Sequence, residues 1–236
     1  MKALKRGLSP HKYFMLYLVS TPIGNLEDIT LRALETLKKV DFILAEDTRR
    51  TKKLLNFYKI STPLISFHEH SSSNKIKQIL EFLSQNKNLA LVTDSGTPAI
   101  SDPGAKLVKK VFETLGAQSI SPIPGPSALT AALSCAGIPI SSFVFLGFPP
   151  HKKARKKFFN QFKSFNFPIV IFESPYRLLK TLKELSEMKN IQIIIFHELT
   201  KIHEGIFQGT PQFLLEKFEK DKSLLHGEFT LLIYKN

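Results

Sequence analysis

The sequence predicts an α/β fold made of two α/β domains, and three patterns support this prediction. In the first half, short apolar runs alternate with segments of helical spacing, which is typical of a mostly parallel sheet covered by helices. In the second half the alternation is looser and predicted strands follow one another, which favours a mixed sheet. The proline-dense stretch Ser119–Ser127 lies between the halves and is the expected boundary.

This boundary gives three expected parts. We expect a basic N-terminal extension over residues 1–13, an N-terminal α/β domain over 14–124 and a C-terminal α/β domain over 125–236. The length of 236 residues is sufficient for two domains that each bury a core.

In the first half, each predicted strand is an apolar run that stops in polar residues, Gly or Pro. These strands cover Phe14–Ser20, Phe42–Glu46, Pro63–Phe67 and Leu89–Thr93. The helices between and after them are expected over Thr30–Val40, through Leu54 and Leu55, over Lys75–Ser84 and over Lys106–Leu115.

The second half contains fewer helices for its number of strands. The predicted strands are Phe143–Phe148, Ile169–Glu173, Ile191–Glu198, Gly205–Gln208 and Glu228–Tyr234. The predicted helices are Ala128–Ala136, Tyr176–Glu187 and Gln212–Phe218, and the basic segment His151–Lys157 is expected to be a loop. Because Cys135 lies in an apolar, helix-like run, we expect it to be packed in the core.

The charge balance indicates an anionic partner. Lys and Arg total 33 against 20 Asp and Glu, which gives a net charge of +13 and makes nucleic acid the first candidate. A Lys-rich genome would produce the same balance without such a partner. A single cysteine fits a reducing compartment, and no apolar run reaches the roughly 18 residues of a membrane span, so we expect a cytoplasmic protein.

Six polar turns, each at the carboxyl end of a predicted strand, are the candidate functional segments. Such ends lie along one edge of a parallel sheet, where ligands bind. The longest turn lies within Leu91–Gly104, which reads LVTDSGTPAISDPG and combines two carboxylates with glycines and prolines. The six turns are Thr21–Asp28, Glu46–Arg50, Phe67–His70, Asp94–Asp102, Pro124–Ser127 and Glu173–Arg177.

Several common motifs are missing from the sequence. It contains no G-x-G-x-x-G fingerprint, no Walker loop and no nucleophile elbow. His68 and His70 would lie on the same side of an extended segment, but two ligands without a third do not make a metal site. We therefore expect no metal.

Nine segments carry a resemblance to a known family. In chain order they read STPIGNLEDITLRALETL, AEDTRRTKKLLN, PLISFHEH, LVTDSGTPAISDPG, PIPGPSALTAAL, FVFLGFPP, FESPYRL, ELTKIHE and GEFTLLI. Together they resemble the bacterial 16S ribosomal RNA cytidine 2′-O-ribose methyltransferases, which belong to the tetrapyrrole methylase superfamily of class III methyltransferases. The match extends from Leu16 to Ile233. It departs at Glu173–Arg177, where the family commonly has His, and the family's usual C-terminal extension has no counterpart in this sequence.

The resemblance implies two α/β domains of the tetrapyrrole methylase type with S-adenosylmethionine in the cleft between them, usually in a homodimer. It also implies which residues bind that cofactor. They are Pro22, Ile23, Gly24, Asp94, Gly96, Thr97, Pro98, Ile100, Ser127, Ala128 and Phe172.

Methyl transfer to a ribose hydroxyl benefits from a base close to that hydroxyl. The candidate carboxylates are Glu46, Asp47, Asp94, Glu173 and Glu198. Our first choice is Glu173, because it ends a strand and Arg177 follows one helical turn later; simple pairing of the two is an equal alternative. The cations expected to bind RNA phosphates are Arg49, Arg50, Lys52, Lys53, Arg177, Lys201 and those of the Lys152–Lys157 loop; for the loop lysines a solvated surface is the alternative.

Three functions remain open at this point. The first is a methyltransferase that acts on the ribose 2′-hydroxyl of a cytidine in 16S ribosomal RNA of the small subunit. The second is a small-molecule, tetrapyrrole-like methylase on the same scaffold, which a charge of +13 does not favour. The third is a catalytically impaired RNA-binding assembly protein.

Overall fold

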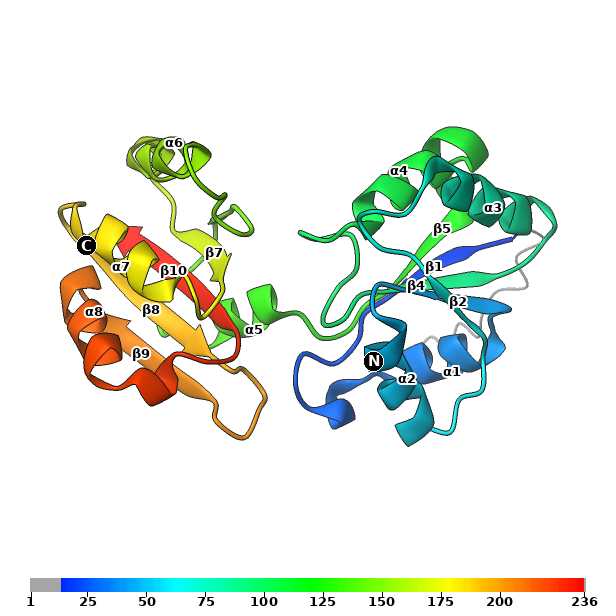
Figure 1. Cartoon of the computed structure of the whole chain (residues 1–236), viewed down its shortest axis with the longest axis horizontal. Helices are drawn as coiled ribbons and strands as arrows, with labels where there is room; N and C mark the ends of the chain where they lie inside the picture. The colour runs from blue at the N-terminus through cyan, green and yellow to red at the C-terminus, as the bar shows by residue number, and fades with distance from the viewer. Residues whose placement is uncertain (1–13, 236) are drawn as a thin grey trace. The chain divides into compact units, whose positions relative to one another are not determined.

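A computed structural model describes residues 14–235 as two compact units, which are shown in Figure 1. Unit 1 comprises residues 14–22 and Leu26–Pro126, and unit 2 comprises Ile23–Asn25 and residues 127–235. The chain passes from unit 1 to unit 2 after Pro126, two residues beyond the boundary that we expected. The expected extension over residues 1–13 lies outside the described residues.

Unit 1 alternates strands and helices along the chain. Its strands are β1 (Leu16–Val19), β2 (Phe42–Ala45), β3 (Leu64–Ser66), β4 (Leu89–Val92) and β5 (Ile120–Ile123). Its helices are α1 (Leu31–Lys39), α2 (Thr48–Phe57), α3 (Ser73–Ser84) and α4 (Gly104–Leu115), with 3₁₀ turns η1 (Leu26–Asp28) and η2 (Ala117–Ser119).

The sheet of unit 1 has the order β3-β2-β4-β1-β5, and every pairing in it is parallel. The carboxyl ends of all five strands therefore lie at one edge of the sheet. The chain leaves β1 toward β2 and leaves β4 toward β5, so the two central strands send it in opposite directions. Such a switch point is where ligands bind in open α/β sheets.

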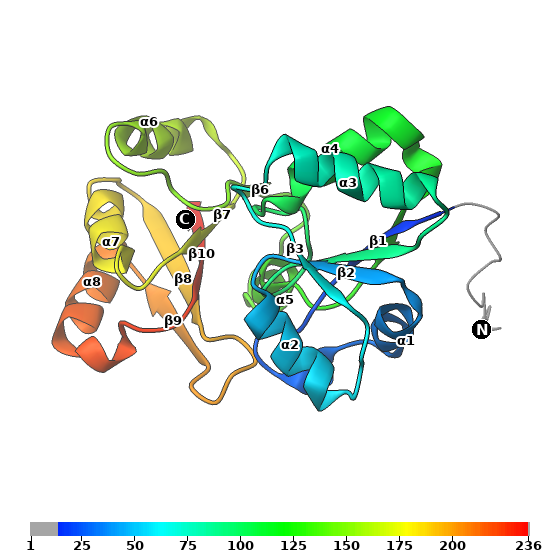
Figure 2. The ribbon, with the colours of Figure 1, turned by 45° about the vertical axis from the view of Figure 1, so that its right-hand side comes forward.

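The two faces of this sheet bury separate cores. On one face, Ala33 and Leu37 of α1 and Leu54 of α2 pack against alternate strand residues such as Ile43. On the other face, side chains of α3 and α4 do the same; they include Ile79, Leu83, Leu107 and Val111. Figure 2 shows α1 and α2 on one side of the sheet and α3 and α4 on the other.

Polar residues at the first turns fix where the helices begin. The side chains of Thr30, Asp47 and Ser72 accept hydrogen bonds from backbone N–H groups at the starts of α1, α2 and α3. Each cap satisfies a donor that has no partner within the helix. Helices α1 and α3 begin within two residues of the expected positions, whereas α2 begins at Thr48, inside the segment Glu46–Arg50 that was expected to be a turn.

Strand β5 is a correction to the sequence analysis, which assigned Ser119–Ser127 to a boundary without a strand. Residues Ile120–Ile123 pair with β1 in register, with Pro122 opposite Leu18. Proline is tolerated here because β5 is an edge strand, where one side of the backbone needs no partner.

Unit 2 has a mixed sheet, as expected from the crowded strands of the second half. The strands are β6 (Val144–Phe145), β7 (Ile169–Glu173), β8 (Ile191–His197), β9 (Gly205–Gly209) and β10 (Phe229–Lys235). The helices are α5 (Ala128–Ser134), α6 (Ala154–Asn160), α7 (Leu178–Ser186) and α8 (Pro211–Lys220), with η3 (Gln161–Ser164) and η4 (Lys222–Leu224).

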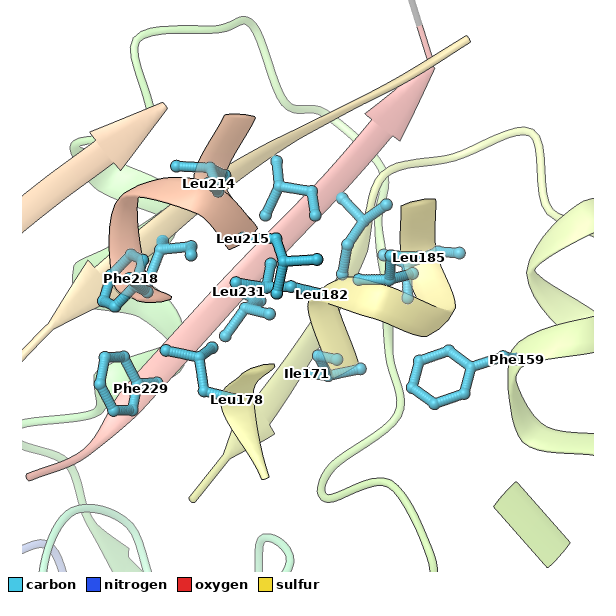
Figure 3. Packing of buried hydrophobic residues seen from close by; sticks show 14 of the residues in the cluster. Phe159, Ile171, Leu178, Leu182, Leu185, Leu214, Leu215, Phe218, Phe229 and Leu231 are labelled. Atoms are coloured by element: carbon cyan, nitrogen blue, oxygen red, sulfur yellow. The ribbon is translucent and has the colours of Figure 1, made fainter. Parts of the chain in front are cut away.

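The sheet order in unit 2 is β6-β7-β10-β8-β9, with β6 and β7 parallel and the other pairs antiparallel. Helices α7 and α8 cover one face through an apolar core, part of which Figure 3 shows. Leu182 of α7 and Leu214 of α8 face Leu231 of β10 in this core. Helix α5 packs on the opposite face, where Ala132 contacts a cluster with Val170 and Phe196.

Two further expectations for unit 2 are wrong. The segment His151–Lys157 is not all loop, because α6 begins at Ala154 and buries Arg155 and Phe159, which are spaced four residues apart on one side of it. Cys135 is exposed rather than packed in the core, because α5 ends at Ser134 and Cys135 follows it as the C-cap. Within residues 14–235, no helix is long and apolar enough to cross a membrane.

Candidate functional site

The turns after β1 and β4 are tied together at the switch point of unit 1. Thr21 and Gly96 exchange backbone hydrogen bonds in both directions, each 3.0 Å long between N and O. The hydroxyl of Thr21 also donates to the carbonyl of Thr93 at 3.2 Å. The two longest polar turns of this edge therefore form one unit rather than separate loops.

Hydroxyl groups also connect these two turns to the last residues of unit 1. The Ser20 and Thr97 hydroxyls lie 3.1 Å apart in hydrogen-bonding contact, and Thr97 Oγ1 donates to the carbonyl of Pro126 at 3.4 Å. Gly125 approaches Ser20 closely enough that a Cβ added to it would lie 3.1 Å from the Ser20 Cβ. The turns after β1, β4 and β5 thus meet around Thr97.

The backbone of the turn after β4 is held in an unusual conformation. Ala99 and Ser101 adopt the left-handed region, with φ of 68° and 56°, and Gly96 does so with φ of 78°. Non-glycine residues in this region are uncommon and are concentrated at functional sites. Ile100 lies between two of these residues with 49% of its surface exposed, an apolar side chain in a polar turn.

Asp94 connects this turn to the start of α2. Its Oδ1 accepts a hydrogen bond from the backbone N–H of Asp47 at 3.1 Å, and its Oδ2 lies 3.3 Å from Nη1 of Arg50. Asp47 caps α2 and binds Arg49 through its side chain at 3.1 Å. The hydrogen bonds from Arg49 hold the pKa of Asp47 at about 2, well below its usual value.

The pKa of Glu46, at the same edge, is shifted in the opposite direction to that of Asp47. Burial raises the pKa of Glu46 above its ordinary value, and the carboxylates of Asp102 and Asp94 raise it further. Glu69 adds to this effect, and only Arg50 opposes it. Raised pKa values of this origin are typical of groups that accept or donate protons in catalysis.

Glu173 of unit 2 is in a different environment. Its side chain is fully buried. Oε1 accepts a hydrogen bond from the Ser174 N–H at 2.8 Å and forms an ion pair with Arg177, whose Nε lies 2.9 Å away and donates to the Ser174 hydroxyl. Its Oε2 accepts a hydrogen bond from the Thr181 hydroxyl and lies 3.5 Å from Nη2 of Arg155. Both oxygens are engaged and none of the side chain faces solvent, so the structure does not support our expectation of a base at Glu173.

Arg177 links the turn after β7 to the loop after β6. In addition to its bond with Glu173, it donates through Nη1 to the carbonyl of Pro149 at 2.9 Å. The neighbouring Phe148 is exposed and lies near Phe172, with ring centroids 5.5 Å apart. Phe172, an expected cofactor residue, is therefore half-buried between strand and loop aromatics.

The loop after β8 contacts Gly24, which belongs to the short segment of unit 2 contributed by the N-terminal part of the chain. A Cβ on Gly24 would overlap Cγ of Lys201 and the Thr200 hydroxyl. Lys201 Nζ itself lies 2.6 Å from Glu198 Oε1 and 3.3 Å from Glu228 Oε2. Glycine is thus required at position 24 by the close approach of this loop.

Ser127 and Ala128 lie where unit 2 begins. Ser127 is the N-cap residue of α5, its carbonyl accepts from the Ala131 N–H at 2.9 Å, and Ala128 is the first helical residue. No side-chain cap bond is formed by Ser127 within the described part of the chain.

The structure thus divides the expected cofactor residues between the units. Asp94, Gly96, Thr97, Pro98 and Ile100 share the turn after β4, whereas Ile23, Gly24, Ser127, Ala128 and Phe172 belong to unit 2, and Pro22 is the last residue of unit 1 before Ile23. No group of three His, Cys, Asp or Glu side chains among residues 14–235 is arranged to hold a metal ion.

Sequence reasoning missed the buried partners of Glu173. Arg155 lies in the segment that the sequence predicts to be a basic loop, yet it is 3% exposed and donates through Nε to Glu184 at 2.6 Å. Its four-residue spacing from Phe159 was the available signal, and the surrounding lysines concealed it. Thr181 was likewise not identified, because a threonine within a helix has no distinctive pattern.

Comparisons with known proteins agree on one family. A family model described as Tetrapyrrole (Corrin/Porphyrin) Methylases matches residues 15–213. The chain is 48% identical over 219 residues to a protein of Thermotoga maritima, covering 92% of this chain and 97% of that protein. It is 44% identical to a protein of Bacillus subtilis, covering 93% of this chain and 74% of that protein. Both relatives are named ribosomal RNA small subunit methyltransferase I, so proteins of this name occur in two lengths.

Solved structures show the same fold at low sequence identity. A cobalt precorrin-4 methyltransferase of cobalamin biosynthesis is 19% identical with a TM-score of 0.68, covering 96% of this chain and 98% of that chain. A diphthine synthase is 14% identical with a TM-score of 0.68, covering 93% and 90%. These likenesses extend over both units and concern the fold alone.

Proposed function

The chain belongs to the tetrapyrrole methylase family, and from this premise we propose that it methylates small-subunit ribosomal RNA with S-adenosylmethionine as methyl donor. The acceptor that we propose is the ribose 2′-hydroxyl of a cytidine in 16S ribosomal RNA. The observation that carries the proposal is the 48% identity, over almost the whole of both chains, to a relative named for methylation of this RNA. The net charge of +13 supports a polyanionic substrate.

The residues at the edge of unit 1 suit the chemistry of this cofactor. Ile100 offers an exposed apolar surface for an aliphatic chain, and the hydroxyls of Ser20 and Thr97 offer hydrogen-bonding groups. Gly96 presents backbone without a Cβ next to them. When bound, S-adenosylmethionine supplies an electrophilic methyl carbon, and the protein's task is to align the acceptor with it.

We further propose Glu46 as the group that takes the proton from the acceptor hydroxyl, in place of Glu173. Asp47 and Glu198 are held in ion pairs with Arg49 and Lys201, and Asp94 is paired with Arg50. Glu46 has no ion-pair partner within 4.0 Å among the described residues, and burial and the neighbouring carboxylates raise its pKa above the ordinary value. A base of higher pKa accepts a proton more readily at the pH of the cell.

The deciding experiment measures transfer of label from S-adenosylmethionine to small ribosomal subunits that lack ribose methylation. Mass mapping of the RNA then locates the label. A single labelled cytidine 2′-oxygen supports the proposal, whereas label on another atom or no label on RNA contradicts it. If the cofactor binds but only a tetrapyrrole accepts the methyl group, the small-molecule alternative replaces our proposal. Absence of cofactor binding would favour an RNA-binding assembly protein.

Two further features belong to the same proposal. We infer a homodimer and a cytoplasmic location, since the family resemblance and the single cysteine support them. Sedimentation of the purified protein tests the first, and fractionation of cells tests the second.

A further inference from the structure

Four of the cations that the sequence singled out for RNA are paired with carboxylates. Arg49 pairs with Asp47 at 3.1 Å and Arg50 with Asp94 at 3.3 Å. In unit 2, Arg177 pairs with Glu173 at 2.9 Å, and Lys201 pairs with Glu198. A phosphate that approached any of these groups would have to compete with a bound carboxylate, which reduces the gain from the contact.

The lysines of the expected RNA-binding loop Lys152–Lys157 have no such competition. The segment His151–Asn160, which we call the lysine arm, contains Lys152, Lys153, Lys156 and Lys157 and no acidic residue. All four lysines are exposed, and none forms an ion pair within residues 14–235. Their charges are therefore available to an external anion.

Contacts of Arg155 hold the lysine arm against the rest of unit 2. Arg155 points inward from α6, where Nε donates to Glu184 at 2.6 Å and Nη2 donates to the Thr181 hydroxyl. The Arg155 guanidinium also lies over the ring of Phe159, 5.0 Å from its centroid. Figure 1 shows α6 at the top of its unit, and in the chain it follows β6 after a loop of eight residues, 146–153. One buried arginine thus fixes a short helix whose other cations face outward.

His151, the first residue of the lysine arm, lies beside the turn after β7. His151 Nε2 is 3.4 Å from Nη1 of Arg177, and the same Nη1 donates to the carbonyl of Pro149. The exposed aromatic ring of Phe148 precedes this contact in the chain. The lysines therefore extend from a loop that also carries an aromatic surface, a combination typical of RNA-binding surfaces.

We propose that the lysine arm is the main phosphate-binding surface of unit 2 for the substrate RNA. This inference rests on the proposed function and specifies which residues hold its substrate. RNA fits better than an acidic protein, because a nucleic-acid strand carries one charge per nucleotide and can meet several neighbouring lysines at once.

The test replaces the four lysines together by Lys152→Gln, Lys153→Gln, Lys156→Gln and Lys157→Gln. Binding to a protein-free, unmodified 16S ribosomal RNA transcript is measured between roughly 50 and 300 mM salt. We expect the slope of log affinity against log salt to become shallower by about 3 and affinity to fall at least about tenfold. Cofactor affinity, measured by calorimetry, and the circular dichroism spectrum should be unchanged.

A matched control removes the same charge elsewhere in unit 2, by Lys183→Gln, Lys189→Gln, Lys220→Gln and Lys222→Gln. These lysines are also exposed and free of ion pairs within the described chain. If the slope of log affinity against log salt becomes shallower by the same amount in both quadruple variants, a general charge effect explains binding and the proposal is wrong. If the arm variant binds free RNA normally but fails on intact subunits, the arm contacts a protein and the proposal is likewise wrong.

The failure of the proposed function has a separate signature. Wild-type protein that transfers no methyl group to RNA contradicts the function, whatever the arm variant does. Wild-type protein that methylates RNA, together with an arm variant whose salt slope is unchanged, contradicts only the lysine arm.

Discussion

Glu46 and Glu173 are both glutamates at the carboxyl end of a strand, but their surroundings are opposite. Glu173 is enclosed by two arginines, a hydroxyl and a backbone N–H, and its side chain has no exposed surface. Glu46 lies among other carboxylates and is partly exposed. The same residue type at the same kind of position thus serves as an internal anchor in unit 2 and as a candidate proton acceptor in unit 1.

This difference shows why position at a strand end does not identify a base. A carboxylate whose lone pairs are all engaged by cations stabilises the fold, because removing it leaves buried charges unpaired. Neighbouring carboxylates raise the pKa of a carboxyl group and so favour its protonated form. Glu173 should therefore contribute to stability, whereas Glu46 should contribute to the rate of methyl transfer.

The largest effect should come from Glu173→Gln. This change leaves Arg155 and Arg177 without their shared carboxylate, and we expect the free energy of unfolding to fall by about 3–5 kcal/mol. Urea unfolding of purified protein measures it. Glu184→Gln is the control, because Glu184 pairs with Arg155 from a partly exposed position, so its effect should be smaller. Equal stability of Glu173→Gln and wild type would show that the cluster is not an anchor.

Glu46→Gln should act on turnover rather than stability. We expect the rate of methyl transfer to fall at least about 100-fold, the low end for loss of a proton acceptor, while cofactor affinity is kept. In the wild type the rate should rise with pH through the raised pKa of Glu46, since only the ionised carboxylate accepts the proton. Single-turnover assays across pH measure both. Glu69→Gln, which removes one repelling neighbour, should retain most activity; a full rate in Glu46→Gln would eliminate Glu46 as the base.

Gly24→Ala should have an intermediate effect. The new methyl group would overlap Lys201 and Thr200, and we expect unfolding to become easier by about 1–3 kcal/mol, as for other overpacked sites. The double variant Gly24→Ala, Lys201→Ala removes the overlapping Cγ, so the two changes should cost less together than their separate effects predict. Strict additivity in urea unfolding would show that Lys201 is not the obstacle.

The smallest effect concerns His197, which is buried and stacked on Phe229. Burial lowers the pKa of His197, although the His226 carbonyl and Glu198 favour the charged form and Lys201 opposes it. Because the folded state resists protonation more than the unfolded state, stability is present above the ordinary histidine pKa and is lost as pH falls below it. Unfolding between about pH 8 and pH 5 should show this loss in wild type and in the exposed control His203→Asn, but less in His197→Asn.

Most of the fold could be predicted from local patterns, because apolar periodicity and capping residues act within a few positions of each other. The helix capped by Thr30 and the strand Leu89–Val92 are examples. The alternation of strands and helices along the sequence also predicted the parallel sheet of unit 1. It therefore predicted that the polar turns lie together at one edge of that sheet. Helix α6 was not predicted, since its inward face combines Phe159 with a charged arginine within a run of lysines.

The candidate site was less predictable than the fold, because its chemistry depends on contacts between distant parts of the chain. Nothing local in the sequence distinguishes Glu46 from Glu173; only the side chains brought near them by folding do so. The same reason explains why Arg49 and Lys201 looked like free cations in the sequence but are paired in the structure.

Strand β5 has a consequence for how unit 1 behaves in concentrated solution. The Ser20 N–H bonds to the carbonyl of Ile123, and since groups alternate along a strand, the nitrogen of Pro122 points to the outer side. That side can offer no amide donor at the middle of the strand to an approaching segment. Edge strands are the usual starting points of aggregation by strand addition. Pro122, which resembles part of a linker in the sequence, therefore disfavours the addition of a further strand at this edge of the sheet.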